Sequence, residues 1–337
     1  PYLLFLIFVT TILGVVIGVL PGLGATTGAA LLLPFTLTMD PVHAIAVLAT
    51  IYVSATFAGS ITAILINTPG TSAAAATTFD GYPLAQKGEA GRALGVAVIS
   101  STVGGVFSVI VLCFAAPLLA RVAYEFRSPE YFALTVFGLS MLASISAGGA
   151  VKNLIGGIFG VWLSTIGAER VTGIERFMFG NYELYEGLHF VPIFIGLFAI
   201  SELLVQSKTV NKIVNTVSMK AVKLPTKEDY KKIWKTILRS CGIGTFIGVL
   251  PAEGATVASM IGYSEARRWS KNKDEFGKGA IEGIAGAEAA NNSATGGAMV
   301  PTMVLGIPGS GTTAIILVGL MVHGLRPGVY LFTEQVE

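Results

Sequence analysis

Long apolar stretches separated by short polar segments dominate this sequence. A helix that crosses a bilayer needs roughly 20 apolar residues, and stretches near that length recur throughout the chain. They occupy residues 1–20, 42–66, 93–120, 131–147, 151–167, 188–206, 240–262, 280–305 and 310–325. Most are rich in Gly, Ala, Ser and Thr, which let membrane helices approach closely. The pattern predicts an all-α, polytopic transmembrane protein.

One segment interrupts this pattern with basic residues. Residues 207–239 carry nine Lys and Arg side chains, and the positive-inside rule places such a segment in the cytoplasm. Its second part, PTKEDYKKIWKTILRS, mixes basic and apolar residues at roughly helical spacing. This spacing favours an amphipathic arm along the membrane surface, with an ordinary solvated connector as the alternative.

A second basic stretch, residues 267–278, follows after a single apolar stretch, 240–262. If both basic stretches are cytoplasmic, the chain between them must enter the membrane and return. Its centre reads LPAEG, and Pro and Gly are poor helix formers. We therefore predict a re-entrant hairpin at about 240–263, with its tip at Pro251–Gly254.

The same hairpin signal occurs near the start of the chain. GVVIGVLPGLGAT (14–26) matches GTFIGVLPAEGAT (244–256) at nine of thirteen positions, which predicts a first hairpin at about 14–34. A Pro-Gly break in a helical stretch follows each copy: AILINTPGTSAAAATT (63–78) and TMVLGIPGSGTTAIIL (302–317). The broken helices are predicted at about 42–79 and 280–325.

The two copies are expected to have opposite orientations. Five predicted crossings separate the hairpins, and an odd number gives two inverted repeats, as in many secondary transporters. Merging 131–147 with 151–167 would reverse that conclusion. The expected organisation is a first half at 1–206 with further spans at 93–206, a cytoplasmic basic loop and arm at 207–239, and a second half at 240–337. We expect the chain to be part of a longer protein, truncated at its C-terminus.

The paired breaks are the candidate binding site. A broken helix exposes backbone N–H groups that attract anions and carbonyl groups that suit a cation such as Na⁺. The candidate solute-binding residues are Pro21, Gly22, Leu23, Gly24, Ala25, Thr26, Thr27, Asn67, Thr68, Pro69, Gly70, Thr71, Ser72, Gly254, Ala255, Thr256, Pro308, Gly309, Ser310, Gly311, Thr312 and Thr313. The candidate coupling-cation residues are Glu253, Glu288, Asn291, Asn292 and Gly306.

Ionisable groups at membrane depth are costly and usually functional. Glu253, at the second hairpin tip, is expected to bind a cation, to carry a proton or to cap backbone N–H groups. Glu288, Asn291 and Asn292 share one helix face. Cation coordination, a gate lining and interhelical hydrogen bonding are the open interpretations of that face.

Composition narrows the class of protein. The chain is 53% hydrophobic and only 12% charged, whereas soluble domains carry about 25% charged residues. Two Cys and three scattered His residues give no disulfide framework or metal cluster. GLGATTG (22–28) lacks the Lys-Ser/Thr ending of a phosphate-binding loop. The sequence also shows no grouping of a nucleophile with a base that would indicate an enzyme. We expect no nucleic-acid partner; an ion or carboxylate channel or uniporter is the alternative to a transporter.

The repeat motifs resemble the large membrane subunit of the tripartite tricarboxylate transporters, the TctA family. The resemblance is carried by GVLPGLGATTGAALLLPFT, by GSITAILINTPGTSAAAATTFDGYPLAQKGEAGRALG and by EAANNSATGGAMVPTMVLGIPGSGTTA. It implies cation-coupled uptake of tri- or dicarboxylates across a bacterial inner membrane. It also implies a small membrane subunit and a periplasmic solute-binding protein as partners. No cofactor is expected apart from a bound Na⁺, and a homo-oligomer is left open. By analogy with other hairpin-bearing carriers, we expect an elevator-like motion.

Overall fold

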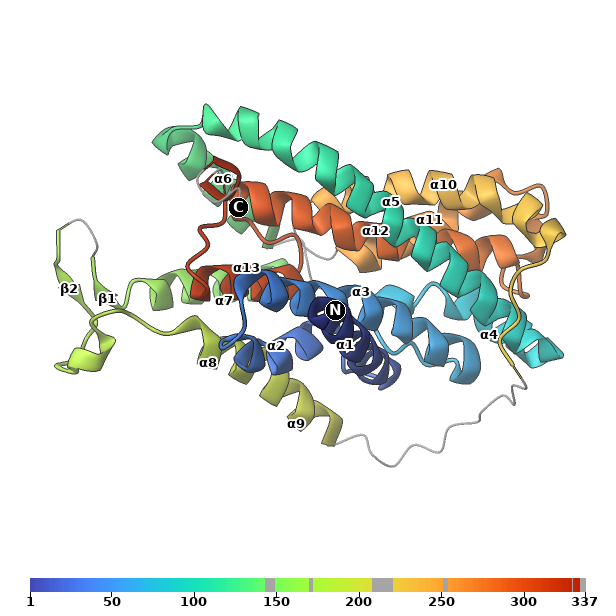
Figure 1. Ribbon diagram of the computed structural model, residues 1–337, viewed down its shortest axis with the longest axis horizontal. Coiled ribbons are helices and arrows are strands. Elements are labelled where there is room, and N and C mark those ends of the chain that lie inside the picture. Colours follow the sequence, from blue (N-terminus) through green and yellow to red (C-terminus); the bar gives the residue numbers. More distant parts are fainter. Residues whose placement is uncertain (143–148, 170–171, 208–220, 251–253, 329, 334–337) are drawn as a thin grey trace.

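The computed structural model describes residues 1–142, 149–169, 172–207, 221–250, 254–328 and 330–333, which fold almost entirely into helices (Figure 1). The all-α prediction is thus confirmed for this part of the chain. The helices are α1 (Tyr2–Val19), α2 (Ala25–Thr36), α3 (Pro41–Ile66), η1 (Ser72–Ala74), α4 (Thr78–Leu84), η2 (Ala85–Glu89), α5 (Ala90–Tyr124), α6 (Ser128–Leu142), α7 (Ala150–Ser164), η3 (Tyr182–Leu184), α8 (Phe190–Phe194), η4 (Ile195–Ile200), α9 (Ser201–Ser207), α10 (Lys227–Val249), α11 (Gly254–Trp269), η5 (Lys273–Glu275), α12 (Ile281–Leu305), α13 (Gly311–Val322) and α14 (Tyr330–Thr333). Two short strands, β1 (Gly167–Ala168) and β2 (Glu175–Arg176), pair antiparallel.

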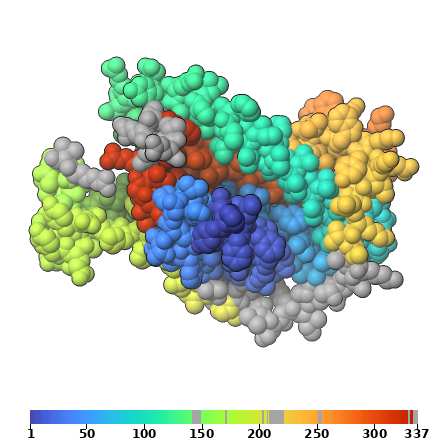
Figure 2. Space-filling model, viewed as in Figure 1, coloured from blue at the N-terminus to red at the C-terminus, as the bar shows by residue number. Residues whose placement is uncertain are grey.

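Among the described residues, three helical segments are long and apolar enough to cross a membrane: α1, α3 and the run from Thr78 to Tyr124 that includes α5. α1 and α5 expose many large apolar side chains, as expected for surfaces that face lipid. α12 is less apolar, yet it is buried at nearly every position. In Figure 2 the blue N-terminal segment and teal α5 partly cover the orange-red segment that contains α12. Protein therefore surrounds α12, and its Glu and Asn residues have protein partners.

Small residues pack the two hairpins against the two broken helices in the same way. A Cβ on Gly18 of α1 would lie 2.3 Å from the Ala55 carbonyl oxygen on α3. At the corresponding place, a Cβ on Gly248 of α10 would lie 2.4 Å from the Ala294 carbonyl oxygen on α12. Only glycine permits such backbone contact. Each hairpin is thereby fixed to the broken helix that follows it.

The two breaks have the same backbone geometry. α3 ends at Asn67 (φ 54°) and α12 at Gly306 (φ 69°), both left-handed. The next N–H groups, of Thr68 and Ile307, each donate to a carbonyl six residues back at 3.3 Å. The same two carbonyls, of Thr62 and Pro301, also accept from the N–H groups of Asn67 and Gly306, so an otherwise unpaired carbonyl is satisfied at each helix end. The Pro-Gly motif thus encodes one stop signal, used twice.

The broken helices α3 and α12 run antiparallel to each other. Tyr52, in the middle of α3, contacts Ser310 beyond the end of α12. Asn291, in the middle of α12, contacts Ala73 beyond the end of α3. The middle of each helix therefore lies beside the segment that follows the C-terminal end of the other, which is possible only if the two helices run in opposite directions.

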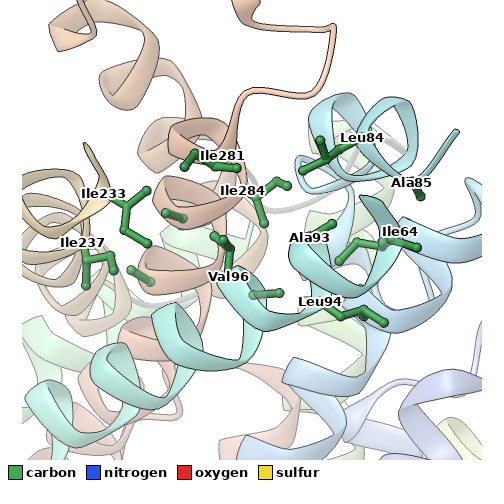
Figure 3. Close-up of a cluster of buried hydrophobic side chains, with 14 of the residues drawn as sticks. Ile64, Leu84, Ala85, Ala93, Leu94, Val96, Ile233, Ile237, Ile281 and Ile284 are labelled. Carbon is green, nitrogen blue, oxygen red and sulfur yellow. The ribbon is translucent and has the colours of Figure 1, made fainter. Parts of the chain in front are cut away.

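A core of apolar side chains joins the two halves (Figure 3). Ile233 and Ile237 of α10, Ile281 and Ile284 of α12, and Val96 of α5 are all buried in this cluster. α5 therefore provides packing surface for elements from both halves of the chain.

The segment predicted to be an amphipathic arm forms the first part of α10, the first helix of the second hairpin. α10 runs without interruption from Lys227, in the basic segment, to Val249, next to the hairpin tip. Thr226 caps it: the Thr226 hydroxyl accepts from the Asp229 N–H at 3.2 Å, and Asp229 accepts from the Thr226 N–H at 2.9 Å. The rest of the basic loop, 208–220, and the second tip, 251–253, lie outside the described residues.

Candidate solute and cation site

The first hairpin tip meets the segment after the second break. The Thr26 and Thr312 hydroxyl oxygens are 2.9 Å apart, and the Tyr52 and Ser310 hydroxyl oxygens are 3.2 Å apart. A Cβ on Gly311 would come within 3.3 Å of Thr26. The N-termini of α2 and α13, from opposite halves of the chain, therefore lie side by side.

The second hairpin meets the segment after the first break in a related way. The Ser72 and Thr256 hydroxyl oxygens are 2.9 Å apart. The Asn291 side-chain amide donates to the Ala73 carbonyl at 3.2 Å. Thr26 and Thr256 occupy the same position of the repeated motif. Each hairpin thus contacts the break of the other half.

The N-terminus of α2 has unused hydrogen-bond donors. Its N-cap residue, Gly24, provides no side-chain acceptor. The N–H groups of Ala25, Thr26 and Thr27 have no acceptor in the described part of the chain. Such groups, together with the helix dipole, favour an anion. α13 differs, because Ser310 and Thr313 form a capping box at its start.

Several other solute candidates form the backbone hydrogen bonds that hold the two breaks in place. The Gly22 N–H donates to the Gly70 carbonyl at 3.2 Å, which joins the first tip to its own break. The Gly70 N–H donates to the Gly59 carbonyl at 3.1 Å, and the Gly309 N–H donates to the Thr302 hydroxyl at 3.2 Å. The remaining candidates in the described chain flank these contacts along the backbone: Pro21, Leu23, Asn67, Thr68, Pro69, Thr71, Gly254, Ala255 and Pro308.

Three of the cation candidates form one buried cluster. Glu288 is fully buried and accepts hydrogen bonds from the Thr77 hydroxyl, from the Ser101 hydroxyl at 2.8 Å and from the Asn291 amide at 3.4 Å. The Asn292 amide donates to the Asn291 side-chain oxygen at 2.6 Å. Within the described residues, no basic side chain forms an ion pair with Glu288. Its hydrogen-bonding partners are therefore neutral.

In the described chain, Asn292 Oδ1 is buried without a hydrogen-bond partner, and the buried Ser60 hydroxyl also interacts with Glu288. Oxygen atoms of carboxylate, amide and hydroxyl groups are the ligands that a hard cation prefers. The donor set therefore fits a small cation such as Na⁺. Gly306 lies elsewhere, at the second break, and Glu253 lies outside the described residues.

A pocket of about 470 Å³ adjoins the Glu288 cluster. Ser101 and Asn292 line it and also belong to the cluster. The rest of its wall comes from α1, α3 and α5: Thr11, Val15, Ala49, Thr50, Val53, Ser54, Phe57, Val98 and Thr102. Two members of the cluster therefore form part of the wall of this pocket.

Sequence reasoning missed Thr77, Ser101 and Tyr52. Thr77 lies at the end of the first break motif, where no single Thr stands out, Ser101 belongs to no motif, and Tyr52 lies in an ordinary apolar span. A hydroxyl in an apolar span usually bonds to its own helix, as Thr56 does to the Tyr52 carbonyl at 2.7 Å. Only the fold shows that these three hydroxyls reach across to other segments.

In the first turn of α5, Arg92 joins this helix to Asp229 at the base of α10. Their side chains form an ion pair, and Arg92 also contacts Glu89 at 2.7 Å. Burial raises the pKa of Asp229, but hydrogen bonds from Arg92 and Thr226 outweigh it, so the net pKa is below the ordinary 3.8. This pair fixes the start of the second hairpin to the first half.

These features together define an α-helical membrane protein with duplicated, broken helices that meet across its two halves. The family model of the tripartite tricarboxylate transporter TctA family matches residues 4–337, and the chain belongs to that family. TctA is a transporter family rather than an enzyme family.

Two relatives from Agrobacterium vitis are similar to this chain. The uncharacterized 52.8 kDa protein in the TAR-I ttuC' 3' region is 42% identical over 330 residues, which cover 97% of this chain and 65% of the relative. The uncharacterized protein in the TAR-II ttuC' 3' region is 44% identical over 92 residues, 27% of this chain and 38% of the relative. The chain thus spans 65% of the first relative's length. No solved structure matches it significantly.

Proposed function

We propose that this chain is part of the large transmembrane subunit of a secondary transporter that imports tri- or dicarboxylates across a bacterial inner membrane. Family membership supports transport and a carboxylate solute. A small membrane subunit and a periplasmic solute-binding protein complete the proposed system. A Na⁺ or H⁺ gradient drives uptake.

The observation that carries this proposal is the pair of crosswise contacts, Thr26 with Thr312 and Thr256 with Ser72. Each contact brings hydroxyl groups and helix-start N–H groups together without Lys or Arg. We infer that each is a subsite for one carboxylate group. A solute with at least two carboxylates can then bridge both halves of the protein, whereas a monocarboxylate occupies only one subsite.

The antiparallel course of α3 and α12 supports the inverted-repeat interpretation, with the hairpins as re-entrant segments. Two similar units in opposite orientations can exchange roles, which is the basis of alternating access. We propose an elevator-like motion in which both hairpins and both breaks move together. The small-residue contacts of Gly18 and Gly248 favour motion of each hairpin with its broken helix as one body.

We place the coupling cation at the Glu288 cluster. Charge balance supports this, because a buried carboxylate with neutral partners is stabilised by a bound cation or proton. Asn291 belongs to the cluster and also holds Ala73 of the first break. Cation binding is thereby linked to the geometry of the solute subsite.

The decisive experiment reconstitutes the full-length protein with its partner subunits in proteoliposomes. Uptake of radiolabelled citrate is followed with and without the binding protein under an imposed Na⁺ or proton gradient. Accumulation that requires both the binding protein and an ion gradient supports a coupled tripartite carrier, and the gradient that is required identifies the coupling ion. Downhill flux that ignores the gradient would instead favour a channel or uniporter. If citrate is not carried, the same assay is repeated with dicarboxylates, and no flux of any of them would reject the function.

The subsites are tested with Thr26→Val and Thr256→Val. Each removes one hydroxyl of a crosswise contact and should raise KM about ten-fold, because one hydrogen bond to a charged group contributes roughly 1.5 kcal/mol. Thr135→Val is the matched control, since its exposed hydroxyl bonds to the Tyr131 carbonyl on its own helix, α6. Equal KM values for all three variants would reject the subsites.

A further inference from the structure

The exposed side of the second hairpin changes character along its length. Near the tip it presents aliphatic and aromatic side chains, with Phe246 71% and Ile261 39% exposed. Toward the open end it presents Trp234 on α10 and Trp269 on α11, 48% and 63% exposed. Basic residues follow at the same end of both helices. The order apolar, Trp, basic is typical of a helix surface that passes from bilayer core to headgroups.

Two stripes run side by side on the first part of α10. Tyr230, Trp234 and Leu238 are spaced four residues apart and are exposed. Lys231, Lys235 and Arg239 have the same spacing, and we call them the basic stripe. Residues four apart share one helix face. The helix thus offers an apolar stripe and a cationic stripe in contact with each other.

The basic stripe is held close to both indole rings. Lys235 Nζ lies 5.4 Å from the centre of the Trp234 ring, and the Arg239 guanidinium lies 5.3 Å from that of Trp269. These are cation–π distances. The cationic groups are thereby positioned at the level of the Trp side chains rather than extended into solvent.

No carboxylate in the described chain lies within ion-pair distance of the basic stripe. Neighbouring cations are paired: Lys232 with Glu275 at 3.9 Å and Arg268 with Glu265 at 3.2 Å. Arg239 Nε is buried and has no acceptor in the described chain. The positive charge of the stripe is therefore available to an external anion.

We propose that the basic stripe, flanked by Trp234 and Trp269, binds the headgroup of an anionic phospholipid. The phosphate accepts from Lys231, Lys235 and Arg239, and the acyl chains lie along the apolar stripe toward Phe246. Charge complementarity and the order of side chains along the hairpin select a lipid surface over a soluble partner. The proposal goes beyond the transport function and does not depend on which solute is carried.

The test uses tryptophan quenching by brominated lipids. Full-length protein carrying Trp162→Phe retains Trp234 and Trp269 as probes from this chain's tryptophans, and any Trp beyond residue 337 is replaced by Phe. It is reconstituted with brominated phosphatidylglycerol or brominated phosphatidylcholine. We expect half-quenching at about five-fold lower phosphatidylglycerol content, because the three basic residues attract an anionic headgroup and salt screens part of this attraction. Raising the salt concentration should remove the preference.

The triple variant Lys231→Gln, Lys235→Gln, Arg239→Gln should abolish the preference. The matched control, Lys227→Gln, Lys271→Gln, Lys273→Gln, removes the same charge from the same end of the hairpin and should keep it. Equal quenching by the two lipids in the parent protein would overturn the proposal, as would equal loss in both triple variants. If the first triple variant does not fold, the salt dependence and the control variant decide the result.

Discussion

The two halves of this protein share a backbone plan and differ in side-chain chemistry. Their breaks stop a helix in the same way, at Asn67 and at Gly306. In the middle of the broken helices, however, α12 carries the buried Glu288, whereas the corresponding position in α3 is Ala49. The two breaks thus share a backbone geometry, whereas the buried carboxylate is present only in the second of the two broken helices. In the proposed function, the second broken helix holds the coupling charge and both breaks contribute to the solute site.

The largest expected effect tests the shared backbone plan. Gly70→Val places a Cβ 2.1 Å from the Gly18 carbonyl oxygen, and Gly309→Val places one 2.8 Å from Ala298 Cα. Each should destabilise the fold by about 3 kcal/mol, because neither backbone contact can yield cheaply. Thermal unfolding in detergent measures the loss. Gly105→Val is the control, with no atom within 4 Å of its added Cβ. A similar loss of stability in this control would show that the close backbone contacts at the breaks are not the cause.

The next effect tests the chemical difference between the halves. Glu288→Ala leaves the Thr77 and Ser101 hydroxyls without their acceptor and opens a cavity. We expect a loss of about 2–3 kcal/mol. Tyr52→Phe removes one hydrogen bond, to Ser310, and should lose only about 1 kcal/mol. Equal losses in thermal unfolding would mean that the charge is not concentrated in α12.

A third test concerns the bases of the two hairpins. α10 has the Arg92–Asp229 pair, whereas α1 has no side-chain cap. The pKa of Asp229 is below its ordinary 3.8, so the pair's contribution is complete above that value and is lost as pH falls through the folded pKa. Asp229→Asn should therefore lower the free energy of unfolding near neutral pH by about 1 kcal/mol, a value that allows for solvent screening. Below about pH 4, the free energy of unfolding of this variant should decrease less steeply than that of the parent protein.

Melting temperatures from pH 7 to pH 3 measure this effect, with Glu89→Gln as the control on the exposed partner of Arg92. A pH profile of Asp229→Asn identical to that of the parent would show that the pair does not stabilise the hairpin.

The smallest effect exchanges the two stop residues. Asn and Gly both tolerate the left-handed conformation, so Asn67→Gly and Gly306→Asn should each change stability by less than about 1 kcal/mol. Asn67→Val and Gly306→Val should each cost about 1–2 kcal/mol, since a β-branched residue is strained at positive φ. Unequal penalties for the two Val variants would show that the stops are not equivalent.

Local sequence patterns predicted the all-helical fold and both Pro-Gly breaks, because Pro and Gly act on the backbone beside them. The contacts between halves could not be predicted. Thr77 and Glu288 are 211 residues apart, and Thr26 and Thr312 are 286 apart. Such pairings depend on the antiparallel packing of α3 and α12, which leaves no mark in either segment. The same limit hid the role of Ser101, which reaches Glu288 from α5.

The unbroken course of α10 has a mechanical consequence. A helix of 23 residues is about 34 Å long, and it is stiff compared with the loops at its ends. Its base is tied to α5 by Arg92 and its far end adjoins the second tip. A tilt of about 10° at the base would sweep the far end through roughly 6 Å, by the length of such a helix. In the proposed transport cycle, α10, with α12 fixed to it at Gly248, would act as a lever that turns a small rearrangement at its base into a larger displacement at the proposed solute site.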